Sequence, residues 1–134
     1  MKQLMIVIGC MVSIVLMSQS TPSSKASAMR GKKIYTTYCL ACHQADGGGV
    51  PRMNPPLIKT EYVNGDKVRL INIVLKGLND PIEINGDEYS NPMASHAFLN
   101  DQQVADVLSF VRSNFGNKSG PITPAEVKAV RAKK

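Results

Sequence analysis

The sequence predicts an all-α fold of three to five helices, with one small β-hairpin ahead of the last long helix. Apolar residues recur at three- and four-residue spacing in several separate stretches, which indicates helices with one buried face. An alternating stretch surrounds one Asn-Gly pair, the strongest short-range signal for a hairpin. Aromatic residues make up only 5% of the 134 residues and Trp is absent, so side chains alone would give a thin core.

The first 28 residues have the layout of a secretory signal peptide. A basic start at Lys2 precedes an uncharged run over residues 4–17, and a polar stretch then ends in Ala-Ser-Ala at Ala28, after which we expect cleavage. The run has 14 residues, short of the roughly 20 that span a bilayer, and an uncleaved membrane anchor is the alternative. Cys10 lies in a context like a lipoprotein cleavage box, but the apolar run continues past it, which favours its removal with the leader.

The rest of the chain divides into a domain at residues 29–117 and a basic tail with a short helix at residues 118–134. The whole chain has a net charge of +6, yet residues 29–117 contain nine Lys or Arg and nine Asp or Glu. The tail holds five Lys or Arg against one acidic residue, Glu126. A balanced domain without a basic face interleaved with aromatic residues argues against a nucleic-acid partner.

The first expected helix covers about residues 31–41, where Ile34, Tyr35 and Tyr38 recur at helical spacing. It should end near His43, because an aspartate and three glycines follow. Residues 50–57 then contain three prolines, which predict an extended, stiff loop.

A second helix and the hairpin follow this loop. Asp66 can cap a helix that runs through about Leu75, and Gly77 closes it. Residues 81–89 alternate around Asn85-Gly86 and predict a two-stranded hairpin, which cannot be an independent sheet.

The strongest helical pattern lies in residues 98–116, with Asn100 or Asp101 as its cap. A last short helix begins at Thr123, where a proline at the first position and Glu126 complete a capping box. We expect this last helix to be a solvated extension.

The segment Cys-Leu-Ala-Cys-His places the thiols of Cys39 and Cys42 three residues apart, with the imidazole of His43 directly after them. A disulfide redox pair is expected beside a βαβ unit, which the pattern lacks, and gives His43 no role. A zinc site needs four ligands, and His96 is the only further candidate. A structural disulfide leaves the thin core unexplained. Covalent attachment of one haem fits best, because both thiols can bond to its vinyl groups, His43 can bind the iron, and the flat apolar ring can complete the core.

These residues and their surroundings resemble a class I c-type cytochrome, in particular the small bacterial monohaem cytochromes that accompany quinoprotein dehydrogenases. The resemblance covers residues 31–116 and rests on GKKIYTTYCLACHQADGGGVPRMNPPL, YVNGDKVRLINIVLKGL, the PIEINGDEY hairpin and MASHAFLNDQQVADVLSFVRSNFGN. It implies a cytochrome c fold around one covalently bound haem c with its iron.

The resemblance also implies roles for further residues. Met93, on the loop before the last long helix, would be the second axial ligand of the iron, and its soft, neutral thioether would favour reduced iron. A carbonyl of the proline-rich loop, that of Pro55 or else Pro56, would accept the N–H of His43. Leu57 would then pack on the haem face.

Other groups compete with Met93 for the sixth position of the iron. Met29 lies at the expected new terminus, and Met53 follows His43 by only ten residues, which favours a packing role. His96 is the other common type of axial ligand. A vacant sixth position is the last alternative.

The same resemblance predicts which helices cross. Gly31 and Tyr35 of the first helix should meet Val107 and Phe110 of the last long helix. A glycine at such a crossing lets two helix backbones approach closely.

The sequence therefore predicts a periplasmic electron carrier without catalytic residues. It would pass single electrons from a periplasmic dehydrogenase, such as a quinoprotein, to a terminal oxidase, and it would take no small-molecule substrate. Contact with a membrane is expected only if the N-terminal segment stays uncleaved. The alternative function is a haem enzyme or a gas or redox sensor with an open or His-ligated sixth site.

Overall fold

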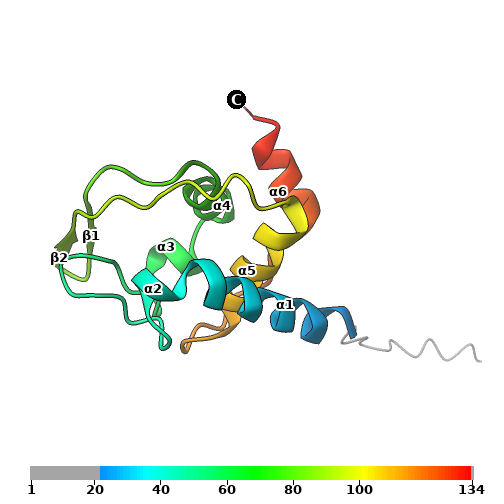
Figure 1. Cartoon of the computed structure of the whole chain (residues 1–134), viewed down its shortest axis with the longest axis horizontal. Coiled ribbons are helices and arrows are strands. Elements are labelled where there is room, and N and C mark those ends of the chain that lie inside the picture. The colour runs from blue at the N-terminus through cyan, green and yellow to red at the C-terminus, as the bar shows by residue number, and fades with distance from the viewer. Residues whose placement is uncertain (1–21, 134) are drawn as a thin grey trace, which may run out of the picture.

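The computed structural model describes residues 22–133, and within them the chain forms six helices and one two-stranded antiparallel sheet. The all-α class with a small hairpin is confirmed. The elements are, in chain order, α1 (Pro22–Tyr38), α2 (Leu40–His43), α3 (Glu61–Asn64), α4 (Lys67–Lys76), β1 (Ile82–Ile84), β2 (Asp87–Tyr89), α5 (Asp101–Ser113) and α6 (Pro124–Arg131). Figure 1 shows α1 crossing α5, with α6 beside α5 and the hairpin at the far end of the molecule.

The helix count exceeds the expected three to five for two reasons. The stretch predicted as one helix over residues 31–41 is divided at Cys39 into α1 and α2, and the single turn α3, capped by the Thr60 hydroxyl, was not predicted. In addition, α1 begins at Pro22, earlier than expected. Residues 1–21, with Lys2, the apolar run and Cys10 of the expected leader, lie outside the described residues. The expected cleavage point after Ala28 falls within α1, and cleavage there stays a prediction.

The predicted caps are confirmed. The Asp66 side chain accepts the N–H of Arg69 at the start of α4, and Gly77 ends that helix with a φ of 80°. Asn100 rather than Asp101 caps α5, and Thr123 caps α6 within the expected box. Short polar side chains thus fix where the helices begin.

The predicted hairpin turns at Asn85-Gly86, where both residues have positive φ values of 56° and 87°. Its register places Ile82 opposite Tyr89 and Glu83 opposite Glu88. Ile84 and Tyr89 are buried, so one face of the hairpin covers the interior.

The expected crossing of α1 and α5 is confirmed at Phe110. A Cβ atom on Gly31 would overlap the carbonyl oxygen of Asp106 and lie 2.7 Å from the Cβ of Phe110. One turn later the Tyr35 ring packs against Phe110 and Phe115, with centroid distances of 5.5 and 5.2 Å. The absence of a side chain at Gly31 therefore sets how closely these two helices pack.

A buried carboxylate anchors the N-terminal half of α1 to α5. Asp106 is only 1% exposed, and Arg30 donates to it from Nε at 2.6 Å and from Nη2 at 3.0 Å. Ser27 and Gln102 donate to the same carboxylate at 2.5 and 2.9 Å. Burial alone would raise the pKa of Asp106, but these hydrogen bonds outweigh it and lower the pKa below its usual value.

The expectation that α6 is a solvated extension is wrong. Val127 is 0% exposed, and Val130 is also buried. Lys67 of α4 bridges to Glu126 at 2.9 Å, and Arg131 bridges to Asp101 of α5 at 2.8 Å. The tail helix completes the core on the side where α4 and α5 meet.

Candidate functional site

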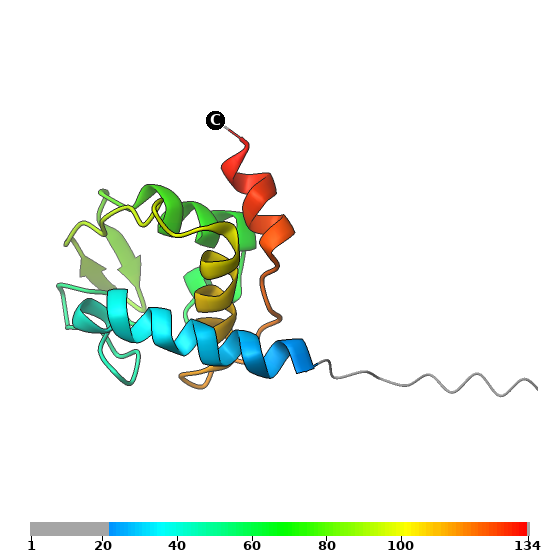
Figure 2. The same cartoon turned by 45° about the vertical axis from the view of Figure 1, so that its right-hand side comes forward.

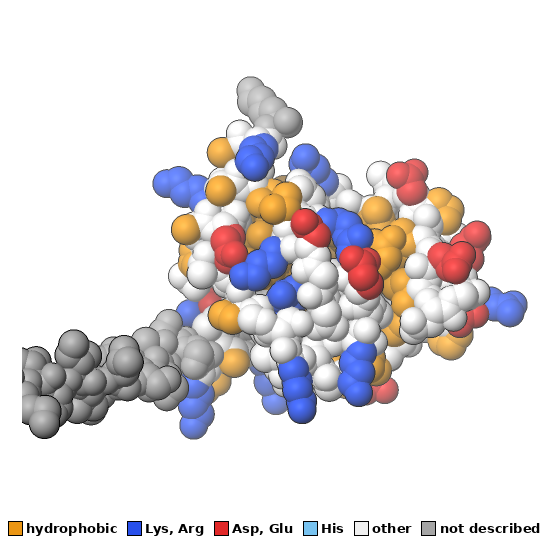
Figure 3. All heavy atoms as spheres, turned by 180° about the vertical axis from the view of Figure 1, so that it is seen from behind, with side chains coloured by type: hydrophobic (Ala, Val, Ile, Leu, Met, Phe, Trp, Pro, Cys, Tyr) orange, Lys and Arg blue, Asp and Glu red, His pale blue; other side chains and the backbone are white. Residues whose placement is uncertain are grey.

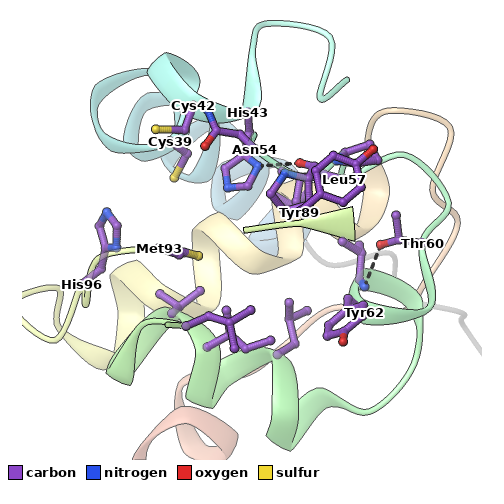
Figure 4. A pocket seen from close by; sticks show the side chains of 18 of the residues that line it. Cys39, Cys42, His43, Asn54, Leu57, Thr60, Tyr62, Tyr89, Met93 and His96 are labelled. Atoms are coloured by element: carbon purple, nitrogen blue, oxygen red, sulfur yellow. Dashed lines mark hydrogen bonds between the residues drawn. The ribbon is translucent and has the colours of Figure 1, made fainter. Parts of the chain in front are cut away.

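A cavity of about 330 Å³ lies among α1, α2, α4, α5, the hairpin and the loop before α5. In Figure 2 these elements stand around the central region of the molecule. The lining is mostly apolar, with side chains from distant parts of the sequence. Figure 4 shows His43 and the Met93 thioether pointing into this space from different segments. Cys39, Cys42, His43, Pro55, Leu57, Met93 and His96 all line it.

The two cysteines lie at the break between α1 and α2. Cys39 precedes α2 with a φ of −113°, and the N–H of His43 bonds to its carbonyl at 2.9 Å. Neither cysteine forms a disulfide; Cys39 is half-buried and Cys42 is exposed. Burial, with the neighbouring Cys42, raises the pKa of Cys39 to about 11. A thiol that stays protonated at neutral pH does not suit the disulfide redox alternative, because the thiolate is the reactive form.

His43 is buried and held by the proline-rich loop. Its Nδ1 lies 3.0 Å from the carbonyl oxygen of Pro55, which can only accept, so Nδ1 carries the proton. Burial lowers the pKa of His43, although the bond to Pro55 acts in the opposite direction. The ring is therefore neutral at pH 7, and its Nε2 has a free lone pair for a metal.

The glycine run brings the proline-rich loop against His43. Gly49 donates to the His43 carbonyl at 3.1 Å, and Leu57 donates to the Gly47 carbonyl at 2.7 Å. Gly49 has a φ of 67°, and a Cβ there would lie 2.7 Å from the carbonyl oxygen of Pro55. The glycine thus lets the Pro55 carbonyl approach the histidine turn.

Met93 is fixed by its backbone. It forms two hydrogen bonds with Leu78, of 2.9 and 2.8 Å, just after α4. The Ser95 hydroxyl donates to the Leu75 carbonyl at 2.6 Å, and the His96 N–H donates to the Val74 carbonyl at 2.9 Å. Gly77 faces Met93 without a Cβ, which would collide with the Met93 carbonyl oxygen. The loop therefore holds the thioether at the cavity wall.

The other candidate ligands are placed differently. Met29 and Met53 are exposed and do not line the cavity. His96 does line it, half-buried, and its Nδ1 lies 2.9 Å from the Ala94 carbonyl. Within residues 22–133, no group of three or more His, Cys, Asp or Glu side chains is placed to hold a metal ion, so the zinc alternative lacks its ligands.

The hairpin forms one further wall of the site. Ile82, Ile84 and Tyr89 line the cavity, and they occupy one face of the two strands. The alternation of apolar and polar residues around Asn85-Gly86 could have indicated this wall. A two-stranded hairpin is not stable alone, so its apolar face has to pack against another part of the molecule.

The arrangement fits a covalently attached porphyrin. Two neighbouring thiols, a buried neutral imidazole and a thioether face one apolar cavity. A large apolar group in this space would complete the thin core, and the nitrogen and sulfur donors suit iron on both sides.

Comparisons with known proteins point in the same direction. The model of the cytochrome c family matches residues 28–115. Cytochrome c-552 of Thermus thermophilus is 37% identical over 113 residues, which cover 78% of this chain and 86% of that protein. The cytochrome c subunit of the quinone alcohol dehydrogenase of Gluconacetobacter polyoxogenes is 35% identical over 112 residues, and that of the gluconate 2-dehydrogenase of Pantoea cypripedii is 34% identical over 105. These matches cover 81% and 75% of this chain, but only 24% of each subunit.

Proposed function

The chain belongs to the cytochrome c family and carries its covalently bound haem c, and from this premise we propose how this electron carrier holds its cofactor. Cys39 and Cys42 would form the two thioether bonds, and His43 and Met93 would bind the iron. The haem, when bound, supplies one-electron redox chemistry. The observation that carries the proposal is that His43 and Met93 enter one cavity, each held by backbone hydrogen bonds.

The protein side of the mechanism is to keep both ligands in place in either redox state. The bond from His43 Nδ1 to Pro55 orients the ring, and the paired bonds between Met93 and Leu78 hold the loop. Both anchors are backbone groups whose charge does not change with the redox state. Electron transfer then needs little movement of the chain.

The apolar walls exclude water from the site. Leu57, Leu70, Val74 and Leu108 line the cavity and also belong to the core or pack against it. A dry site held by a thioether ligand favours reduced iron and leaves no position where a substrate has to bind. These properties support an electron carrier without catalytic residues over the haem enzyme or sensor.

We further propose that the carrier works in the periplasm, between a dehydrogenase and a terminal oxidase. The signal-peptide layout of residues 1–28 supports export. The dehydrogenase subunits among its relatives support an upstream partner of that class, such as a quinoprotein. No helix in residues 22–133 is long and apolar enough to cross a bilayer.

The experiment is mass spectrometry and absorption spectroscopy of the protein matured in a host that attaches haem c. We expect one added haem that survives denaturation, and a weak far-red band from the sulfur–iron bond in the oxidised state. Cyanide and carbon monoxide should bind slowly or not at all. Prompt binding of either ligand, without the far-red band, would contradict Met93 as ligand and support the enzyme or sensor.

A further inference from the structure

Two aromatic side chains stand exposed at the rim of the cavity. Tyr38, at the end of α1, and Phe98, on the loop that follows Met93, are 46% and 64% exposed. Their rings meet edge to face, with centroids 5.2 Å apart, and the Phe98 centroid is 5.7 Å from that of His96. Tyr38, His96 and the exposed Cys42 all line the cavity. The pair therefore joins the two segments on which the proposed thioethers and Met93 lie.

The hairpin side of the same cavity is acidic. Asp80, Glu83, Asp87 and Glu88 are all exposed, and Asp80 lines the cavity. Residues 77–111 contain no Lys or Arg. Among the described residues, none of these four carboxylates forms an ion pair.

This arrangement is unfavourable for folding. Glu83 lies directly opposite Glu88 across the two strands, and like charges at such positions destabilise a hairpin. An exposed aromatic pair likewise leaves apolar surface in water. Glu83 and Glu88 lie on the outer face of the hairpin whose inner face, with Ile82, Ile84 and Tyr89, lines the cavity. Two costs to stability, one on the cavity rim and one on the outside of its hairpin wall, indicate a surface shaped for contact with another molecule.

The rest of the molecule has the opposite charge. The whole chain is at +6, and its tail is basic. Figure 3, seen from behind, shows acidic side chains at the hairpin end with a basic side chain beside them, while the remainder of that face carries Lys and Arg side chains with acidic ones among them. Arg30, close to the start of the domain, already pairs with Asp106. A partner attracted by the net charge of the chain would be acidic. A partner attracted by the carboxylates beside the cavity would be basic.

We propose that Tyr38, Phe98 and the hairpin carboxylates form the docking surface through which this chain exchanges electrons, and that its partner is a redox protein with a basic face around an apolar centre. The inference rests on the proposed function and adds the chemistry of the partner. The aromatic pair supplies the dry centre of a small, transient interface. The carboxylates attract and orient a basic partner, against the net charge of the chain.

The test measures the electron exchange of the purified haem protein with three small probes. Two are cations, hexaammineruthenium(II) and tris(phenanthroline)cobalt(III), and one is a trivalent anion, hexacyanoferrate(III). One electron passes from the ruthenium(II) complex to the oxidised protein, or from the reduced protein to the cobalt(III) or iron(III) complex, and no proton moves. The rate with both cations should fall as salt is added, although the protein is positively charged overall.

Paired variants separate local charge from net charge. The hairpin variant Glu83→Gln, Asp87→Asn, Glu88→Gln removes three negative charges, and the α6 variant Ala125→Lys, Ala129→Lys, Ala132→Lys adds three positive charges at exposed positions in the tail, so each raises the net charge by three. The hairpin variant should slow both cations about five-fold at low salt and should unfold at a higher temperature. The α6 variant should change the rates by less than about two-fold. Equal effects of the two variants would overturn the inference.

A second pair of measurements tests the aromatic centre. Phe98→Ser should slow the phenanthroline complex about three-fold, because its flat ligands can stack on the pair, and should leave the ammine complex unchanged. The reduction potential of each variant is also measured. A change of rate caused by a different driving force can then be separated from a change caused by lost contact with the probe. Equal slowing of both cations at an unchanged potential would remove Phe98 from the surface. A wild-type protein that lacks haem, or exchanges electrons with no probe, would instead contradict the proposed function itself.

Discussion

Gly31 of α1 lies against the backbone of Asp106 in α5, so closely that a Cβ atom at residue 31 would be 2.7 Å from the Asp106 carbonyl carbon. This contact is backbone to backbone, and no side-chain rotation can relieve it. The crossing also brings Tyr35 against Phe110. Its geometry therefore sets how α1, the helix that precedes Cys39, packs against the core.

Gly31→Ala should therefore destabilise the protein although alanine is the better helix former. The methyl group forces α1 away from α5, and we expect a loss of about 3 kcal/mol in the free energy of unfolding. Denaturant unfolding of the haem protein measures it. Gly120→Ala is the matched control, because nothing lies within 4 Å of a Cβ there. Equal stabilities of the two variants would contradict the close crossing.

The anchor at Asp106 predicts a dependence of stability on pH. Its pKa is lowered in the folded protein, so the carboxylate stabilises the fold above the unfolded pKa of about 4, and this contribution is lost as pH falls through the folded pKa. Asp106→Asn should cost about 2 kcal/mol at pH 7 and flatten the acid side of the stability curve. Urea unfolding between pH 7 and pH 3 gives both quantities, and parallel curves for the two proteins would argue against the anchor.

Met93→Ala should open the iron while leaving the haem attached. We expect loss of the far-red band, rapid cyanide binding and a large fall in reduction potential, since the thioether stabilises reduced iron. Potentiometry and absorption spectroscopy measure these changes. Met53→Ala is the control, because Met53 is 51% exposed and outside the cavity. An unchanged spectrum for Met93→Ala would mean that another residue is the ligand, and His96→Ala would be the next variant to examine.

The buried face of α6 predicts that the tail contributes to stability. Val127→Ala should cost about 2 kcal/mol, because the side chain is 0% exposed and its removal leaves a cavity. Lys128→Ala, one residue on and exposed, should change the free energy of unfolding little. If Val127→Ala proves equally neutral, α6 does not belong to the core.

Local signals allowed most of the fold to be predicted. Asp66, Asn85-Gly86, Asn100 and Thr123 each act through their own backbone or that of near neighbours, and the elements begin or turn at these residues. The extension of α1 ahead of Gly31 could not be predicted from local pattern, and this part of the helix contacts α5 through Arg30 and Asp106, 76 residues apart. The role of α6 was missed for a similar reason, since Val127 looks like part of a basic tail until α4 and α5 are placed beside it.

The residues of the candidate site also fall into those that local sequence predicts and those that depend on distant parts of the chain. Cys39, Cys42 and His43 stand within five residues, so spacing alone predicts that they act together. The acceptor at Pro55 and the position of Met93 were expected from a family resemblance, since no local pattern links either residue to His43. The hairpin wall and the contact of Tyr38 with Phe98 could not be predicted, because each needs the path of a loop in three dimensions.

The continuation of α1 through Ala28 bears on the order of events in maturation. Proteolysis favours exposed, unstructured backbone, whereas in the folded chain residue 27 is helical and its hydroxyl bonds to Asp106. If the leader is cut after Ala28, as the sequence predicts, the cut would have to come before this segment folds onto α5. A chain that folded first would keep the expected leader.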